Sequence, residues 1–283
     1  MAGLPRARTD VTTLVLSVVG TALLLAALLT YAAGWARLRA LGHGRPAWRL
    51  AAYGLGIFTV FTALVALHEA ADTQFSMHMV QHLMLTMVAA PLLALGDPLP
   101  LVLWGLPRRA RAAVAATLRP GAWLRRVLTV LTWLPVAGGL YVASIWIFHV
   151  PALYDAAAEH ELLHALEHLT FLVTALLFWW PILEPAPRLN PRPHAGLQIL
   201  YLVAATVQNT ALGMILSVPD RAFYPYYVRE AATHGLDAVG DQSFGGGLMW
   251  SMGHMYLLPI FWILYELSRR DEREEDAERT RSA

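Results

Sequence analysis

The chain has 283 residues, of which 57% are hydrophobic and 14% are charged, a composition too apolar for one soluble domain. It contains no cysteine, which excludes structural disulfides, thiolate zinc sites and CxxC redox chemistry. All 21 basic residues are arginine, so the absence of lysine also excludes a retinal Schiff base. A net charge of +1 gives no reason to expect nucleic acid as a partner.

Seven apolar segments are long enough to cross a membrane, since a spanning helix needs about 20 mostly apolar residues. In chain order they are residues 11–33, 50–68, 78–95, 127–148, 160–183, 196–218 and 248–267. The first is longer than the apolar part of a signal peptide, so we interpret it as a retained span. The sequence therefore predicts an all-α, polytopic membrane helix bundle of seven transmembrane helices over 1–267, followed by a charged, disordered tail over 268–283.

The arginines are distributed unequally between the two sets of loops. Seventeen of the 21 lie on one side, and only Arg6, Arg8, Arg221 and Arg229 lie on the other. Because short cytoplasmic loops carry the excess of arginine, we expect the N-terminus outside and the C-terminus in the cytoplasm. The protein is thus predicted to be a multi-pass protein of the bacterial plasma membrane.

Nine of the eleven histidines fall on the predicted outer side: His68, His78, His82, His149, His160, His164, His168, His234 and His254. The spacing of His160, His164 and His168 is i, i+4 and i+8, which places three imidazoles on one face of a helix. Ionisable side chains inside the hydrocarbon are costly and normally indicate function. The cluster favours a metal or haem site over simple polar packing.

Methionines flank two of these histidines, giving "MHMVQH" around His78 and "MGHM" around His254. Thioether and imidazole together suit copper. The predicted metal ligands are His68, His78, Met79, His82, His149, His160, His164, His168, His254 and Met255. Asp72 and Asp241 are predicted to orient the imidazoles.

Other chemistries remain open for the same residues. His160-Glu161-Leu162-Leu163-His164 is an H-E-x-x-H motif, typical of zinc proteases, and His164 to His168 is the inverted form. A zinc protease also needs a third ligand, for which Asp237 and Glu184 are candidates. Two alternatives are that histidines of separate helices ligate haem, or that they fill a polar cavity in a metal-free scaffold for oxidase subunits.

Three blocks of the sequence resemble those of the CtaG-type cytochrome c oxidase assembly factors. They are "FSMHMVQHLMLTMVAAPLLALGDPLPL" (75–101), "EHLTFLVTALLFWWPIL" (167–183) and "DQSFGGGLMW" (241–250). The residues that match are His78, Met79, Gln81 and His82, then Glu167 and His168, then Asp241 and Gln242. From this match Gln81 and Glu167 join the residues predicted to support the ligands.

The resemblance implies a role in building haem–copper oxidases, by supplying copper at the outer face and without enzymatic activity. The expected partners are cytochrome c oxidase subunits and other copper chaperones. In the predicted site, His78 and His82 face His164 and His168 across two spans. His160 and His254 are expected at its entrance.

Overall fold

The computed structural model describes residues 11–282, with side chains as far as residue 269. This range consists of helices and their connections and contains no strand, which confirms the all-α prediction. Six helices are long and apolar enough to cross a membrane, and a bent helix pair provides a seventh span when it is counted as one. The chain is therefore a polytopic membrane helix bundle. Arg6 and Arg8, and the N-terminus itself, lie outside the described residues, so the orientation stays a prediction.

The first three spans follow the predicted segments closely. α1 (Val11–Ala40) is one continuous helix. α2 (Ala47–Phe61) continues through the π-helix η1 (Thr62–Ala66), and the third span runs through α4 (Phe75–Leu83), η2 (Met84–Ala89) and α5 (Ala90–Leu95). The short helix α3 (His68–Thr73) joins the second span to the third.

The π-helical turn η2 precedes Pro91, which has no N–H to donate to the preceding turn. The carbonyl of Thr86 accepts instead from the indole Nε1–H of Trp179, at 3.0 Å. π-helical turns within α-helices occur often at functional sites, and η2 follows directly after the helix that carries His78 and His82.

The predicted fourth span is broken rather than continuous. α8 (Trp123–Leu131) and α9 (Leu134–Phe148) meet at an angle of 69°. Pro135 is in the first turn of α9, where its fixed φ favours a helix start and its ring disfavours helix before it. The seventh span also differs, because it begins at Ala238, ten residues before the predicted start at 248.

The fifth and sixth spans are α11 (Glu161–Leu183) and α12 (Ala195–Ser217). The seventh combines α14 (Ala238–Gly253), the 3₁₀ turn η3 (His254–Tyr256) and α15 (Leu257–Ser282). α15 thus continues through the residues predicted as a separate tail, and the division of the chain at 267 stays a prediction. The connecting helices are α6 (Pro98–Gly105), α7 (Arg108–Thr117), α10 (Pro151–Glu159) and α13 (Pro225–His234).

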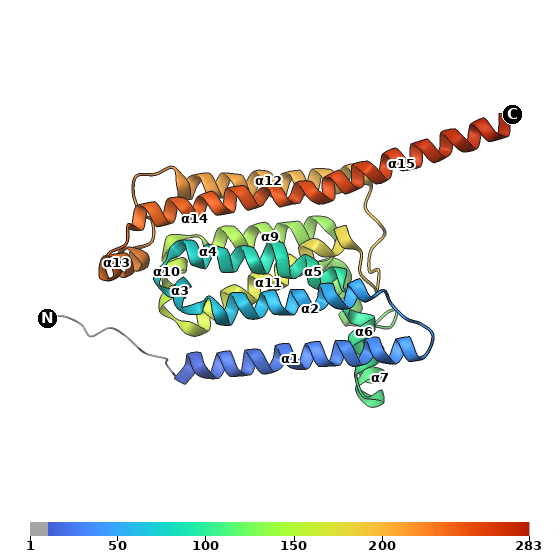
Figure 1. Cartoon of the computed structure of the whole chain (residues 1–283), viewed down its shortest axis with the longest axis horizontal. Coiled ribbons are helices and arrows are strands. Elements are labelled where there is room, and N and C mark those ends of the chain that lie inside the picture. The colour runs from blue at the N-terminus through green and yellow to red at the C-terminus, as the bar shows by residue number, and fades with distance from the viewer. Residues whose placement is uncertain (1–10, 283) are drawn as a thin grey trace.

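The helices lie side by side, with α1 along one edge and α12 with α14 along the opposite edge (Figure 1). α1 contacts α6 through glycine. A Cβ added at Gly34 would overlap the carbonyl oxygen of Leu101, and one added at Gly105 would overlap that of Thr30. Such close approach of two backbones requires small residues. The buried residues of α1 are Tyr31, Gly34 and Leu38, so the half of α1 that precedes them has little contact with the bundle.

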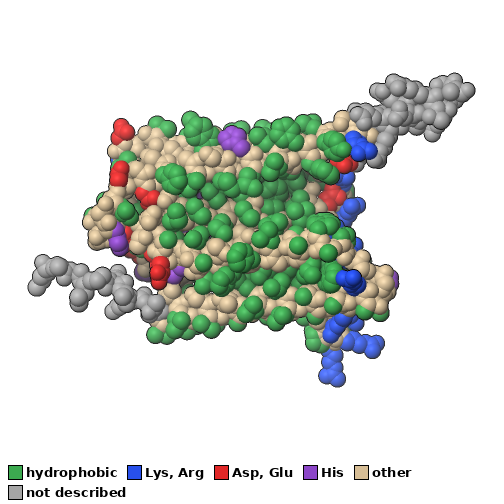
Figure 2. Space-filling model, viewed as in Figure 1, with side chains coloured by type: hydrophobic (Ala, Val, Ile, Leu, Met, Phe, Trp, Pro, Cys, Tyr) green, Lys and Arg blue, Asp and Glu red, His purple; other side chains and the backbone are tan. Residues whose placement is uncertain are grey.

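The two ends of the bundle differ in charge (Figure 2). We call the end that carries α3, α10 and α13 the histidine end, and the end that carries α6 and α7 the arginine end. Hydrophobic side chains cover the flank between them, as expected for a surface that faces lipid, and acidic and histidine side chains gather at the histidine end.

Candidate metal site

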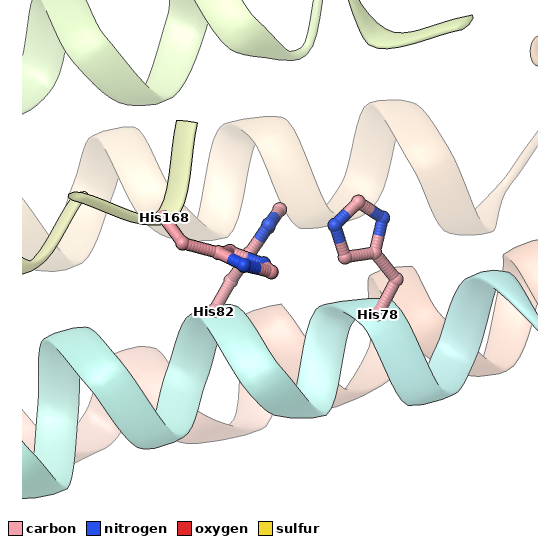
Figure 3. Close-up of side chains that lie close together, drawn as sticks. All are labelled: His78, His82 and His168. Atoms are coloured by element: carbon pink, nitrogen blue, oxygen red, sulfur yellow. The ribbon is translucent and has the colours of Figure 1, made fainter. Parts of the chain in front are cut away.

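Histidines of two helices meet inside the histidine end. His78 and His82 share one face of α4 because they are four residues apart, and His164 and His168 do the same on α11. His78, His82 and His168 each offer one ring nitrogen, and these atoms lie within 4.8 Å of one another. We call these three residues the buried triad; their rings converge in Figure 3.

Glu167 lies beside the buried triad and is itself fully buried. Its Oε1 is 3.5 Å from Nε2 of His82, and its Oε2 is 3.8 Å from Nε2 of His78. Only the family resemblance predicts a supporting role for Glu167, whereas the structure places its carboxylate against two of the three imidazoles.

Several polar atoms here have no hydrogen-bond partner within the described part of the chain. They are both ring nitrogens of His82, Nε2 of His168 and both carboxylate oxygens of Glu167. Burial of a polar group without a hydrogen bond is costly, and most buried polar atoms in proteins are paired. One imidazole nitrogen each from His82 and His168, with the Glu167 carboxylate beside them, forms a donor set that fits a transition-metal ion.

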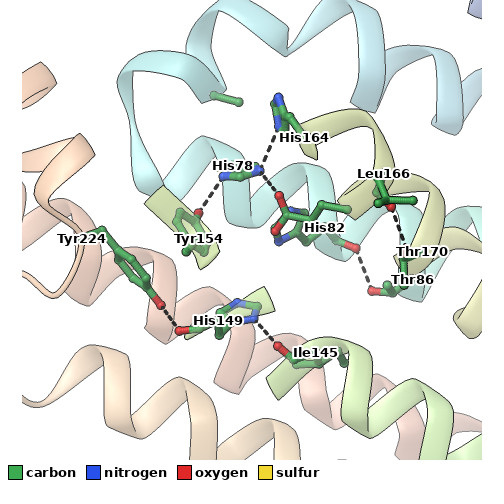
Figure 4. Close-up of polar contacts among 12 residues, drawn as sticks. His78, His82, Thr86, Ile145, His149, Tyr154, His164, Leu166, Thr170 and Tyr224 are labelled. Atoms are coloured by element: carbon green, nitrogen blue, oxygen red, sulfur yellow. Dashed lines mark hydrogen bonds and ion pairs between the residues drawn. The ribbon is translucent and has the colours of Figure 1, made fainter. Parts of the chain in front are cut away.

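Two tyrosines hold the ring of His78. Tyr154 Oη is 2.6 Å from Nδ1 of His78 (Figure 4), and Tyr227 Oη is 3.0 Å from the same atom. The Tyr227 hydroxyl donates its proton to the carbonyl of Ala71 at 2.7 Å, so its oxygen can accept from His78. When Nδ1–H of His78 donates to these oxygens, the lone pair of Nε2 faces the cluster, which is the tautomer that a metal requires.

His149 lies next to the buried triad without belonging to it. Its Nδ1 is 2.7 Å from the carbonyl oxygen of Ile145, and because a carbonyl can only accept, Nδ1 carries the proton. Its buried Nε2 is then an acceptor, and no described residue donates to it. The ring centroids of His149 and His82 are 6.0 Å apart.

Two further groups of potential ligands adjoin the buried triad. His68, Asp72 and His164 form the half-exposed triad, and His78, His164 and Glu167 form the linking triad; in each, the ligand atoms lie within 4.8 Å of one another. Burial raises the pKa of the Asp72 carboxyl to about 6, an effect that His68 opposes and Glu161 and Glu230 reinforce.

The structure does not bring His160 or His254 into these three groups. His160 is the extended N-cap of α11 rather than part of its first turn, and its side chain is exposed. His254 follows α14, sixteen residues after that helix begins, and is also exposed. A place for these two residues at the entrance of the site stays a prediction, while His68 and Asp72 are the partly exposed members of the groups.

The structure places the two predicted methionine ligands and the predicted supporting residue Gln81 in the packing of the bundle. Met79 belongs to the apolar core with Phe75, and Met255 packs against the same core. Gln81 donates to the carbonyl of Ala63 in η1 at 2.7 Å. The sequence does not predict the contacts of Tyr154 and Tyr227 with His78, because neither tyrosine belongs to a recognisable motif.

Asp241 acts through the backbone rather than on an imidazole. Its two carboxylate oxygens accept from the Ser76 N–H, at 3.3 and 3.4 Å, at the start of the helix that carries His78. We expect Asp241→Ala to lower the free energy of unfolding by about 1 kcal/mol, as loss of a helix cap does, without loss of bound metal. Thermal unfolding and metal content in detergent test this, with Asp241→Asn as a milder change. Loss of metal from a folded Asp241→Ala would contradict it.

The fold and the site define a polytopic membrane protein that buries histidines of two helices around one carboxylate. Over residues 29–270 the chain matches the family described as cytochrome c oxidase caa3 assembly factor, Caa3_CtaG. The chain belongs to this family, and it is a multi-pass protein of the bacterial plasma membrane.

Curated relatives occur in mycobacteria. Uncharacterized proteins of Mycobacterium bovis and Mycobacterium tuberculosis are each 32% identical over 251 residues, which is 86% of this chain and 37% of the relative. An uncharacterized protein of Mycobacterium leprae is 29% identical over 255 residues, 86% of this chain and 38% of the relative. The chain thus spans less than two fifths of the length of these relatives. No solved structure matches it.

Proposed function

We propose that this protein binds copper at the buried triad and delivers it to a cytochrome c oxidase during assembly. The observation that carries the proposal is the convergence of unpartnered imidazole nitrogens and carboxylate oxygens from His82, Glu167 and His168. Family membership supports the oxidase as the recipient. Oxidase subunits and other copper chaperones are the proposed partners. Copper would pass between them at the outer face, which is the side that the arginine distribution predicts for the histidine end.

The geometry gives each residue a part in holding the ion. His78, His82 and His168 supply nitrogen, and Glu167 supplies negative charge that offsets the cation in a medium of low polarity. α4 and α11 carry these side chains on regular helix, which fixes their positions. The three imidazoles come from two separate helices, so a small shift of α4 against α11 loosens the set and releases the ion.

The same arrangement of residues supports a zinc protease less well. That chemistry requires His160 and His164 on one ion with Glu161 beside a bound water. Neither His160 nor Glu161 belongs to a ligand group in the described chain. The groups that contain His164 join it to His68 and Asp72, or to His78 and Glu167. A metal-free scaffold remains the main competing function.

The test is elemental analysis of protein purified from cells supplied with copper and zinc. We expect about one tightly bound copper per wild-type chain, and loss of this tight ion in His82→Ala/His168→Ala together with loss of oxidase activity in cells. His254→Ala is the matched control, because this exposed histidine lies outside the ligand groups, and it should keep its copper. Metal-free wild-type protein that still supports the oxidase would establish the scaffold instead.

A further inference from the structure

Potential ligands extend from the buried triad toward the surface of the histidine end. His68 and Asp72 lie on α3, one turn apart, with Nε2 of His68 3.8 Å from Oδ2 of Asp72. His164 of α11 completes this half-exposed triad, its ring centroid 6.0 Å from that of His68. The half-exposed triad shares no residue with the buried triad, so each set can hold an ion of its own.

Exposure falls steadily along this series of side chains. The side chains of Asp72 and His68 are 41% and 19% exposed, whereas His164 is 7% and His78 is 1% exposed. A hydrated cation therefore has direct access to the half-exposed triad and none to the buried one. An ion that reaches His78 and His82 must first be held by groups nearer the surface.

The linking triad connects the two sets. Nε2 of His164 is 3.1 Å from Nε2 of His78 (Figure 4), and Oε2 of Glu167 is 3.8 Å from the same His78 nitrogen. His164 is thus shared with the half-exposed triad and His78 with the buried triad. An ion can pass between the sets while it always keeps at least one ligand.

A cleft of about 370 Å³ runs beside these residues between α1, α2 and α11. Its walls are mostly apolar, and its titratable lining residues are His68, Glu161, His164 and His168. The cleft touches members of all three triads, since His164 belongs to two of them and His168 to the third. It therefore provides space for ligand side chains to change rotamer during a transfer.

We propose that His68, Asp72 and His164 form a second metal site, at which a transition-metal cation is loaded before it moves through the linking triad into the buried triad. This inference rests on the proposed function of the buried triad. In the first step the ion leaves His68 and Asp72, stays on His164 and gains His78 and Glu167. In the second it leaves His164 and gains His82 and His168. The ion keeps its oxidation state throughout, because each step only exchanges protein ligands.

The donor set of the loading site differs from that of the buried triad. Two imidazoles and a carboxylate suit divalent copper or zinc and bind a hydrated ion with less selectivity than three imidazoles. A site that loads and releases an ion should be the weaker of the two. The wild-type chain is accordingly expected to bind two ions with different affinities.

The experiment titrates metal-free, full-length protein in detergent with Cu(II), counts bound ions by equilibrium dialysis, and follows uptake by stopped-flow quenching of tryptophan fluorescence. Wild-type protein should bind two ions. His68→Ala/Asp72→Asn should bind one ion tightly and take it up at least tenfold more slowly. His82→Ala/His168→Ala should retain the weak, rapidly loaded ion.

The matched control is His160→Ala/Glu69→Gln, which changes an exposed histidine and an exposed carboxylate at the same end but outside the triads. It should bind two ions at the wild-type rate. The tight ion retained by His68→Ala/Asp72→Asn shows that this variant is folded.

The outcomes separate the two proposals. If His68→Ala/Asp72→Asn takes up its ion at the wild-type rate, or still binds two, the loading site is wrong while copper binding at the buried triad stands. If the wild-type chain binds no copper at all, the proposed function fails and the loading site fails with it.

Discussion

Glu167→Gln should weaken copper binding about 100-fold, or about 2.7 kcal/mol, while the metal-free protein becomes no less stable. The Glu167 carboxylate is buried against His78 and His82, and none of its oxygens has a hydrogen-bond partner in the described chain. Such a group destabilises the metal-free state. Glutamine has nearly the same shape and removes this cost, but it also removes the negative charge that offsets the cation.

The opposite signs of the two effects make the result specific. Competition against a chelator measures copper affinity, and thermal unfolding of the metal-free protein measures stability. Glu161→Gln is the control, since it makes the same chemical change at the start of the same helix, outside the triads. Copper affinity unchanged in Glu167→Gln would show that the carboxylate does not balance the ion. A loss of stability in the metal-free variant would show that Glu167 serves the fold.

The spans of this protein could be predicted because membrane helices are specified by local composition. The pairing of His78 with His82 and of His164 with His168 could also be predicted, since residues four apart share a helix face. His160 has the same spacing, yet it does not share the helix face of His164 and His168. α11 begins at Glu161, and His160 has extended backbone, with φ −127° and ψ 107°. The i, i+4 relation holds only inside a helix, and helix boundaries are the least predictable feature of a sequence.

The half-exposed triad could not be assembled from the sequence. Its position depends on α3, a six-residue helix that follows the π-helix η1 and that no apolar periodicity marks. The position of His254 along the seventh span is also predicted wrongly, because the span begins at Ala238 and not at 248. Asp241, Gln242 and three consecutive glycines make the first part of the seventh span look polar, so the predicted span begins too late. The contact of Tyr154 and Tyr227 with His78 depends on the packing of α10 and α13, which local patterns do not specify.

Replacement of Asp97, at the arginine end, is the second change expected to have a large effect, in this case on the free energy of unfolding. It is almost fully buried and has φ of 53°, in the left-handed region. Its Oδ1 accepts from the Ala186 N–H at 2.7 Å, and its Oδ2 is 3.3 Å from Nη1 of Arg49 and 3.9 Å from Nη2 of Arg45. One carboxylate thus joins three connections, which follow α1, α5 and α11.

We expect Asp97→Ala to lower the free energy of unfolding by about 3 kcal/mol. It leaves the half-buried N–H of Ala186 and the Arg49 guanidinium without the Asp97 carboxylate. It also places alanine in a left-handed conformation that aspartate tolerates better. Asp97→Asn keeps an acceptor for the Ala186 N–H and tolerates the same backbone, so about 1 kcal/mol is expected from loss of the charge alone. Unfolding by denaturing detergent measures both variants.

Comparison of these two variants separates the causes. Equal losses in Asp97→Asn and Asp97→Ala would assign the whole effect to the arginine pairs and contradict a role for the backbone contact and the left-handed turn. Asp97 lies at the opposite end of the bundle from the triads, so copper per folded chain should stay at the wild-type value in both variants. A variant that folds but loses copper would mean that the two ends are coupled, because the connection after α11 then sets the position of His164 and His168 on that helix.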